Sequence, residues 1–328
     1  MTVHVFDQAI ALETQGEGRY RGKTPAAYAH MAGPFGGGTG GTGGTGGTDG
    51  TGTLTVKSFY DANANGRWDS GEPELAWRTS VVGVATPAFT PAPYGGLALG
   101  SHEVREAIPS PLTGYTWSAT NAYAGADPYV GTPPAAAVSG GVDYLNSFTA
   151  TLSTAAPSMT VYFGNVCLGG GGAYESGYWI SATELPAGMA PPYTALAALN
   201  LVGADGAPFD PVDYMQLREW MRDASGVNMA YMLSMHLATT KLNVLSGAVD
   251  RSHPVYAPGA FGANDSGYMS LGDLIAEAHT SLGVNNDTRD SGPAREYQVL
   301  LKNALEGSNT NQRFVQATPA SCALNWLD

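Results

Sequence analysis

One segment of the sequence has residue types and spacing suited to holding a cation. It follows the pattern D-x-N-x-N-G-x₅-E, in which Asp61, Asn63, Asn65 and Gly66 are followed by Glu72. Ca²⁺ takes about six to eight oxygen ligands in proteins, and side chains at alternate positions can surround a single point. The segment therefore predicts a calcium-binding loop.

The oxygen donors of this loop can be assigned position by position. Gly66 permits a sharp turn, which lets the backbone carbonyl of Arg67 face the centre. Asp69 is expected to bind directly or through a water molecule, and Glu72 to close the shell with both carboxylate oxygens. The carboxylates among these donors can neutralise a dication. The expected calcium ligands are Asp61, Asn63, Asn65, Arg67 through its carbonyl, Asp69 and Glu72.

The residues that flank the loop favour strands over helices. Leu54 to Tyr60 is rich in β-branched and aromatic residues, which is typical of a strand. Pro73 follows the last ligand and disfavours a helical conformation at Glu72. A calcium loop between strands is therefore expected, and the alternative is a polar turn that binds nothing.

Composition limits the classes of function. The chain has 328 residues, which suggests two domains, and 43% of them are hydrophobic, enough to bury a core. Only 13% are charged, the net charge is −13, and Lys and Arg form no cluster, so nucleic acid is excluded as a partner. No apolar run is long enough to span a bilayer, and no signal peptide is visible at the start.

The chain divides at runs of glycine. Residues 36–53 form a Gly/Thr linker, which separates a short N-terminal segment, 1–35, from the rest. Residues 54–166 are expected to form a β-sandwich, because short strand patterns alternate with Pro and Gly. Residues 167–328 have helical periodicity and predict a mainly α-helical domain. The expected strands are 54–60, 78–85, 100–108, 116–122, 147–152 and 158–163.

Four helices are expected in the C-terminal half. Asp210 followed by Pro211 predicts an N-cap and a first helical residue. A second helix is expected from Met229, and Ser270 with Asp273 resembles a capping box that opens a third. A fourth is expected over residues 294–305.

Other candidate sites carry weaker signals. Cys167 and Cys322 form either a disulfide that closes a long loop or two free buried thiols. Asn264 to Gly267 could be a second cation site, but a plain turn is favoured because the terminal Glu is missing. The histidines lack the spacing of a zinc site, and His236 is expected to be a hydrogen-bonded core residue.

The calcium segment and its flanks, Val56 to Leu75, resemble the start of SdrD B-like (Cna-B-related) domains of bacterial surface proteins. That resemblance covers about 20 residues. It implies a prealbumin/Ig-like β-sandwich that holds calcium through this loop and serves as a stalk or spacer in exported proteins. After Leu75 the sequence departs from the family, because Ala76 to Val82 replaces its usual Gly-Val-x-Val strand.

Two further resemblances are more limited. Residues 1–35 resemble the opening of acyl-CoA thioesterases of the double hotdog fold, but no hotdog sheet or catalytic carboxylate follows. The C-terminal half resembles an uncharacterised helical region attached to such β modules in secreted bacterial proteins. It does so through Cys167 to Gly170, Gly177 to Trp179 and Asn228 to Leu233.

The sequence as a whole predicts an α+β multidomain protein with a structural or adhesive function at the cell surface or outside the cell. Surface or matrix proteins or polysaccharide are the partners that this implies. A secreted hydrolase is the alternative, with an active site built from Glu175, His236, His253 or His279. A thioesterase-derived acyl-CoA enzyme is a third hypothesis, implied only by residues 1–35.

Overall fold

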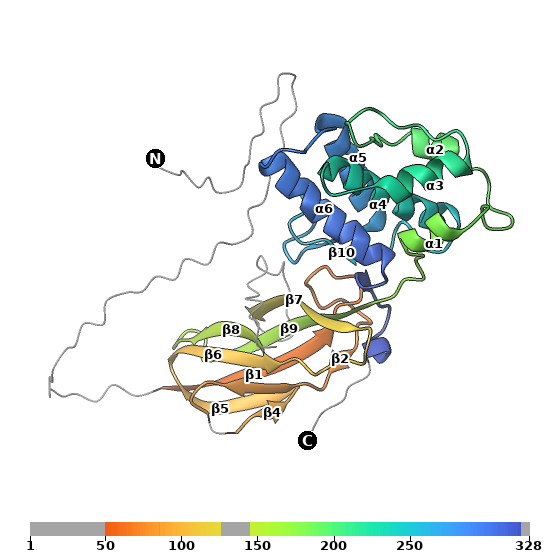
Figure 1. The fold of residues 1–328 in the computed structure, drawn as a ribbon. Helices are drawn as coiled ribbons and strands as arrows, with labels where there is room; N and C mark the ends of the chain where they lie inside the picture. The colour runs from red at the N-terminus through yellow and green to blue at the C-terminus, as the bar shows by residue number, and fades with distance from the viewer. Residues whose placement is uncertain (1–49, 85, 126–144, 323–328) are drawn as a thin grey trace, which may run out of the picture.

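The computed structural model describes residues 50–84, 86–125 and 145–322. In these residues the chain forms two β-sheets and six α-helices, so the expected α+β class is confirmed (Figure 1). We refer to residues 50–169 as the two-sheet region and to residues 170–322 as the helical region. The segment 1–35 and all but the last residues of the linker 36–53 lie outside the described part of the chain.

The strands of the first sheet surround β1 and β9. β1 (Thr51–Tyr60) runs parallel to β9 (Ser158–Gly169) and places Leu54 opposite Met159. The other strands on this sheet are β2 (Glu74–Leu75) and β5 (Ala92–Ala98), which pair with β1, and β7 (Thr116–Gly125), which pairs with β9. The second sheet has the order β4 (Ala88–Phe89), β3 (Arg78–Val81), β6 (Gly100–Ala107), β8 (Leu145–Leu152).

The core of the two-sheet region lies between these sheets. Successive side chains of a strand point to opposite faces, so Leu54 and Val56 of β1 share one face. Both are buried in a cluster with Val104 of β6, Leu152 of β8 and Phe163 of β9. The two sheets therefore pack face to face. All six expected strands are present, and the short strands β2 and β4 and the strand β5 were not predicted.

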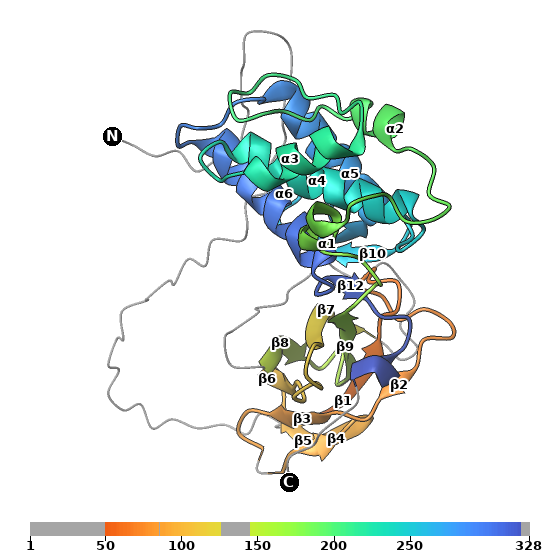
Figure 2. The same cartoon turned by 45° about the vertical axis from the view of Figure 1, so that its right-hand side comes forward.

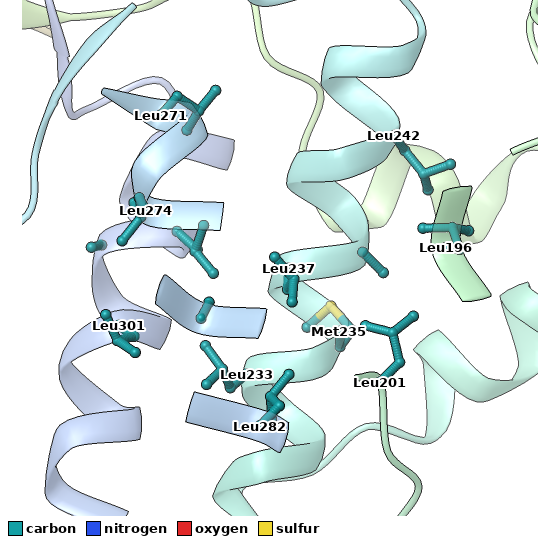
Figure 3. Packing of buried hydrophobic residues seen from close by; sticks show 14 of the residues in the cluster. Leu196, Leu201, Leu233, Met235, Leu237, Leu242, Leu271, Leu274, Leu282 and Leu301 are labelled. Atoms are coloured by element: carbon teal, nitrogen blue, oxygen red, sulfur yellow. The ribbon is translucent and has the colours of Figure 1, made fainter. Parts of the chain in front are cut away.

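The helical region is built around one helix that is buried on most sides. Its helices are α1 (Ser176–Ser181), α2 (Tyr193–Ala197), α3 (Tyr214–Asp223), α4 (Met229–Leu245), α5 (Leu271–Val284) and α6 (Pro293–Asn309). Leu233, Leu237 and Leu242 of α4 are fully buried. Figure 3 shows them between Leu274 of α5, Leu301 of α6 and Leu196 of α2. This helix also buries polar side chains such as His236 and Asn243, so it forms the centre of its region through burial on most of its sides.

The four expected helices are α3 to α6, with an error at the start of α3, and the short helices α1 and α2 were not predicted. Ser270 caps α5 as expected, because its Oγ accepts the N–H of Asp273 at 3.0 Å. The prediction that Asp210 caps α3 was wrong. The helix begins at Tyr214, and Asp213 caps it by accepting the N–H of Gln216 at 2.8 Å. The side chain that caps a helix belongs to the residue directly before its first turn, and Asp213 holds that place.

The two regions share a sheet. β9 continues to Gly169, past the boundary expected after residue 166, and β12 (Phe314–Val315) pairs with its last residues. β10 (Pro254–Tyr256) and β11 (Tyr268–Ser270) extend the sheet into the helical region. Figure 2 shows β12 next to β9, below the helices.

A disulfide joins the two regions a second time. Cys167 of β9 is bonded to Cys322, which ends the 3₁₀ helix η1 (Pro319–Cys322). Both sulfurs are buried among Tyr60, Trp77 and Trp117 of the two-sheet region. Across the described ranges, no helix is both long and apolar enough to cross a membrane.

Candidate metal centre

The predicted calcium loop connects β1 to β2, with a strand on each side as expected. Its first residue is held by the N–H of Asp61, which donates to the carbonyl of Asn165 in β9 at 2.9 Å. At its far end, the carbonyl of Pro73 accepts the N–H of Tyr60, also at 2.9 Å. The loop is therefore closed at its base by backbone hydrogen bonds to rigid strands.

Asp61 lies at the centre of the loop and is fully buried. One carboxylate oxygen accepts the N–H of Asn65 at 3.0 Å, and the other accepts the N–H of Gly66 at 2.6 Å. Gly66 has a φ of 77°, and a Cβ built there would lie 3.2 Å from Cβ of Asn121. Glycine is therefore required at this turn, for its conformation and for space.

Glu72 closes the loop from the other end. Oε1 accepts the N–H of Ala62 at 2.9 Å, and Oε2 accepts the N–H of Asp69 at 2.8 Å. These bonds span the loop from its second residue to its last. Both oxygens of the final carboxylate therefore face the loop backbone and not the solvent.

The two asparagines and Asp69 form the exposed side of the loop. The Oδ1 atoms of Asn63 and Asn65 accept backbone N–H groups at 3.0 and 2.8 Å. Their Nδ2 atoms donate to Oδ2 of Asp69 at 2.9 and 2.6 Å. The Nε atom of Arg67 lies 3.8 Å from Oδ1 of Asp69. In this arrangement, Asp69 faces the partial positive charge of two amide N–H groups and the full positive charge of the Arg67 guanidinium.

The loop is electrostatically suited to a cation. The pKa of Glu72 is raised to about 7, first by burial and then by the neighbouring carboxylates of Asp61 and Asp69. Burial also raises the pKa of Asp61. The pKa of Asp69 is lowered, first by the hydrogen bond from Asn63. Neighbouring carboxylates that are partly buried disfavour each other's ionised forms. A cation bound between them would favour ionisation and lower their pKa values.

The donor set fits Ca²⁺ by its chemistry. Each carboxylate oxygen of Asp61 and Glu72, and each amide oxygen of Asn63 and Asn65, accepts one N–H and retains a second lone pair. Hard oxygen donors of this kind are the ligands Ca²⁺ prefers. Within the described residues, no group of three or more His, Cys, Asp and Glu stands ready to hold a metal, so the set relies on amide and carbonyl oxygens. The ligand assignment, including the carbonyl of Arg67, stays a prediction.

Residues outside the loop hold it in place, and no sequence pattern indicated them. Asn121 of β7 donates from Nδ2 to the carbonyl of Gly66 at 3.1 Å. The hydroxyl of Tyr123, also on β7, accepts the N–H of Trp68 at 3.2 Å. Trp68 stacks on Phe59 with ring centroids 5.5 Å apart and donates from Nε1 to the carbonyl of Glu72 at 3.0 Å. Contacts across strands distant in sequence cannot be read from a local pattern.

The turn from Asn264 to Gly267 is the second cation candidate of the sequence, and it forms a hydrogen-bonded turn. Oδ1 of Asn264 accepts the N–H groups of Ser266 and Tyr268, both at 3.0 Å. Nδ2 of Asn264 donates to the carbonyl of Ala64 at 2.6 Å. The turn therefore lies against the predicted calcium loop.

The residues considered for a hydrolase site have separate partners. His253 bonds to the carbonyl of Val315 at 2.8 Å, and Nδ1 of His279 accepts the N–H of Asn200 at 3.1 Å. His236 is buried, with Nε2 3.8 Å from Glu306, and its pKa is lowered to about 4, chiefly by burial. Among the described residues its Nδ1 has no hydrogen-bond partner, contrary to the expected hydrogen-bonded core histidine. Glu175 is exposed before α1.

A second polar cluster lies inside the two-sheet region and shares Asn165 with the base of the loop. Glu106 of β6 is fully buried and accepts hydrogen bonds from Ser58 at 2.5 Å, Asn146 at 3.0 Å and Asn165 at 3.1 Å. Burial raises its pKa to about 7. The cluster links β1, β6, β8 and β9 and so connects the two sheets.

Comparison of the chain with family models, curated proteins and solved structures gave no match. The function is therefore argued from the geometry of the loop.

Proposed function

We propose that the protein binds one Ca²⁺ ion in the loop from Asp61 to Glu72 and uses it to rigidify a non-catalytic structural module. The observation that carries this proposal is the convergence of hydrogen bonds inside the loop. The carboxylates of Asp61 and Glu72 both turn toward its backbone, where their charges are unfavourable without a counter-ion. A bound dication would offset this repulsion and the cost of burying the two acids.

The proposed module is a prealbumin/Ig-like β-sandwich of the SdrD B-like kind, exported to the cell surface or outside the cell. Its support is the loop sequence, the face-to-face packing of the two sheets and the buried disulfide, since disulfides persist in oxidising compartments. The role is structural or adhesive, with surface or matrix proteins or polysaccharide as partners. The separate partners of His236, His253 and His279 give the hydrolase hypothesis no specific support.

Thermal unfolding of the full chain with and without calcium tests the proposal. A ligand that binds only the folded state stabilises it by about 2.7 kcal/mol at 100 times its Kd. We therefore expect the melting temperature to rise by several degrees with excess Ca²⁺ and to return with EGTA. An unchanged melting temperature would contradict calcium binding.

The variant Glu72→Gln makes this test more specific, because its effect on thermal stability should be of opposite sign with and without calcium. With excess Ca²⁺ it removes a ligand, and we expect calcium affinity to fall by at least about 10- to 100-fold and the melting temperature with it. In EGTA it removes a carboxylate that Asp61 repels, so the variant should be at least as stable as the wild type. The control is Glu219→Gln, which removes the same charge from an exposed site on α3.

A further inference from the structure

A turn of the helical region contacts the backbone of the calcium loop between two expected ligands. Nδ2 of Asn264 donates to the carbonyl of Ala64 at 2.6 Å. Ala64 lies between Asn63 and Asn65, so any movement of its peptide groups moves both of these side chains. The contact joins residues that are 200 positions apart in the sequence.

The amide of Asn264 is oriented by its own turn. Because Oδ1 accepts the N–H groups of Ser266 and Tyr268, Nδ2 is directed toward the loop. The turn is also hydrogen-bonded to β7. Ser266 Oγ donates to the carbonyl of Thr120, and the hydroxyl of Tyr268 donates to Ser118 Oγ at 2.8 Å. Nδ2 of Asn264 is therefore held toward the loop by a turn that is itself hydrogen-bonded to β7.

Ala64 needs this support because of its conformation. Its φ is 55°, in the left-handed region, which is unfavourable for a residue with a side chain. Its methyl group is fully buried in a cluster with Val166, Leu168, Tyr268 and Val315, the last two from the helical region. The N–H of Ala64 donates to the carbonyl of Asp61 at 3.1 Å. Contacts from the helical region thus help to hold Ala64 in this left-handed conformation.

We propose that Asn264 is a positioning residue for the calcium site. It fixes Ala64, and through it Asn63 and Asn65, in the conformation that presents their oxygens. Coupling of this kind is reciprocal, so calcium must tighten the attachment of the helical region by the same factor by which that attachment raises calcium affinity. This inference rests on the proposed calcium binding.

The first test compares Asn264→Ala with Asn286→Ala in the full chain. Both remove an asparagine Nδ2 that donates to a loop carbonyl, since Asn286 donates to Gly206 at 3.0 Å within the helical region. Calorimetric titration with Ca²⁺ should show a Kd about 5- to 10-fold higher for Asn264→Ala, as expected for one lost hydrogen bond. Asn286→Ala should match the wild type.

The second test measures the reciprocal effect by hydrogen exchange. The N–H of Ala257 donates to the carbonyl of Gly267 at 2.8 Å, and the N–H of Gly267 donates to the carbonyl of Asn264 at 2.9 Å, so both report on the turn. Calcium should slow their exchange in the wild type and much less in Asn264→Ala. A purely structural role of Asn264 would speed exchange equally with and without calcium.

The outcomes separate this inference from the proposed function. A wild-type protein that binds no calcium overturns both. Calcium binding by the wild type with an unchanged Kd for Asn264→Ala, or with equal calcium protection of the turn in the two proteins, overturns only the positioning role.

Discussion

At the scale of the residue, buried carboxylates in this protein serve two different purposes. Asp61 and Glu72 lie within one loop, where the carboxylate of Asp61 disfavours ionisation of Glu72 and the carboxylate of Asp69 disfavours ionisation of both. Glu106 lies alone between the sheets, with neutral partners in Ser58, Asn146 and Asn165. A bound cation would stabilise the ionised carboxylates of the loop, whereas burial of Glu106 favours its protonated form.

Glu106 should make the protein less stable as the pH rises. Its pKa is about 7 in the folded state against an ordinary value of 4.5, so between these values the folded state binds more protons than the unfolded state. Stability is then fully present below about pH 4.5 and is lost as the pH rises through about 7, by about 3 kcal/mol in total.

The variant Glu106→Gln should remove this contribution. The free energy of unfolding of the variant minus that of the wild type should be about 3 kcal/mol larger at pH 8 than at pH 4.5, because the wild type loses stability as the pH rises. Urea denaturation of both proteins at the two pH values, in EGTA, measures the difference. Equal pH dependence of the two proteins would show that Glu106 ionises normally.

At the scale of the element, the helix caps allow a simple check of the helical region. Ser270 satisfies the N–H of Asp273 at the start of α5, and Asp213 satisfies the N–H of Gln216 at the start of α3. Replacing either by Ala should lower the free energy of unfolding by about 1 kcal/mol, measured by urea denaturation. Asp210→Ala is the control, because α3 begins after it, and a loss as large as that of Asp213→Ala would contradict the assignment.

Local patterns predicted most of these elements, since they depend on neighbours in the sequence. Strand alternation gave β1 and β6, and capping chemistry gave the start of α5. The short strands β10, β11 and β12 could not be predicted, because pairing with distant residues defines them. For the same reason, the loop pattern indicated candidate ligands but not the support from Asn121 and Asn264.

At the scale of the molecule, the helical region is held at both of its ends. It leaves the two-sheet region at the end of β9 and returns through β12, and the disulfide then closes the loop from Cys167 to Cys322. The sequence left free thiols as an alternative, and the structure shows the disulfide. The two cysteines have a sequence separation of 155, and cross-linking so long a loop removes much entropy from the unfolded chain.

Replacing both Cys167 and Cys322 by Ala should therefore lower the free energy of unfolding by about 3–5 kcal/mol. Chemical denaturation measures this loss, and reduction of the wild type should reproduce most of it. The double variant avoids leaving one buried thiol without a partner. A loss below about 1 kcal/mol would show that the cross-link contributes little beyond the packing around it.

Calorimetric titration of the full chain with Ca²⁺ is the most direct test of the central claim. We expect one ion per chain, with a Kd in the range of about 10⁻⁵ to 10⁻³ M, as for calcium sites in sensor and extracellular modules. Asp61→Asn should weaken that binding, because it removes the buried carboxylate at the centre of the loop. Absence of binding at millimolar Ca²⁺, or binding unaffected by Asp61→Asn, would contradict the assignment of this loop.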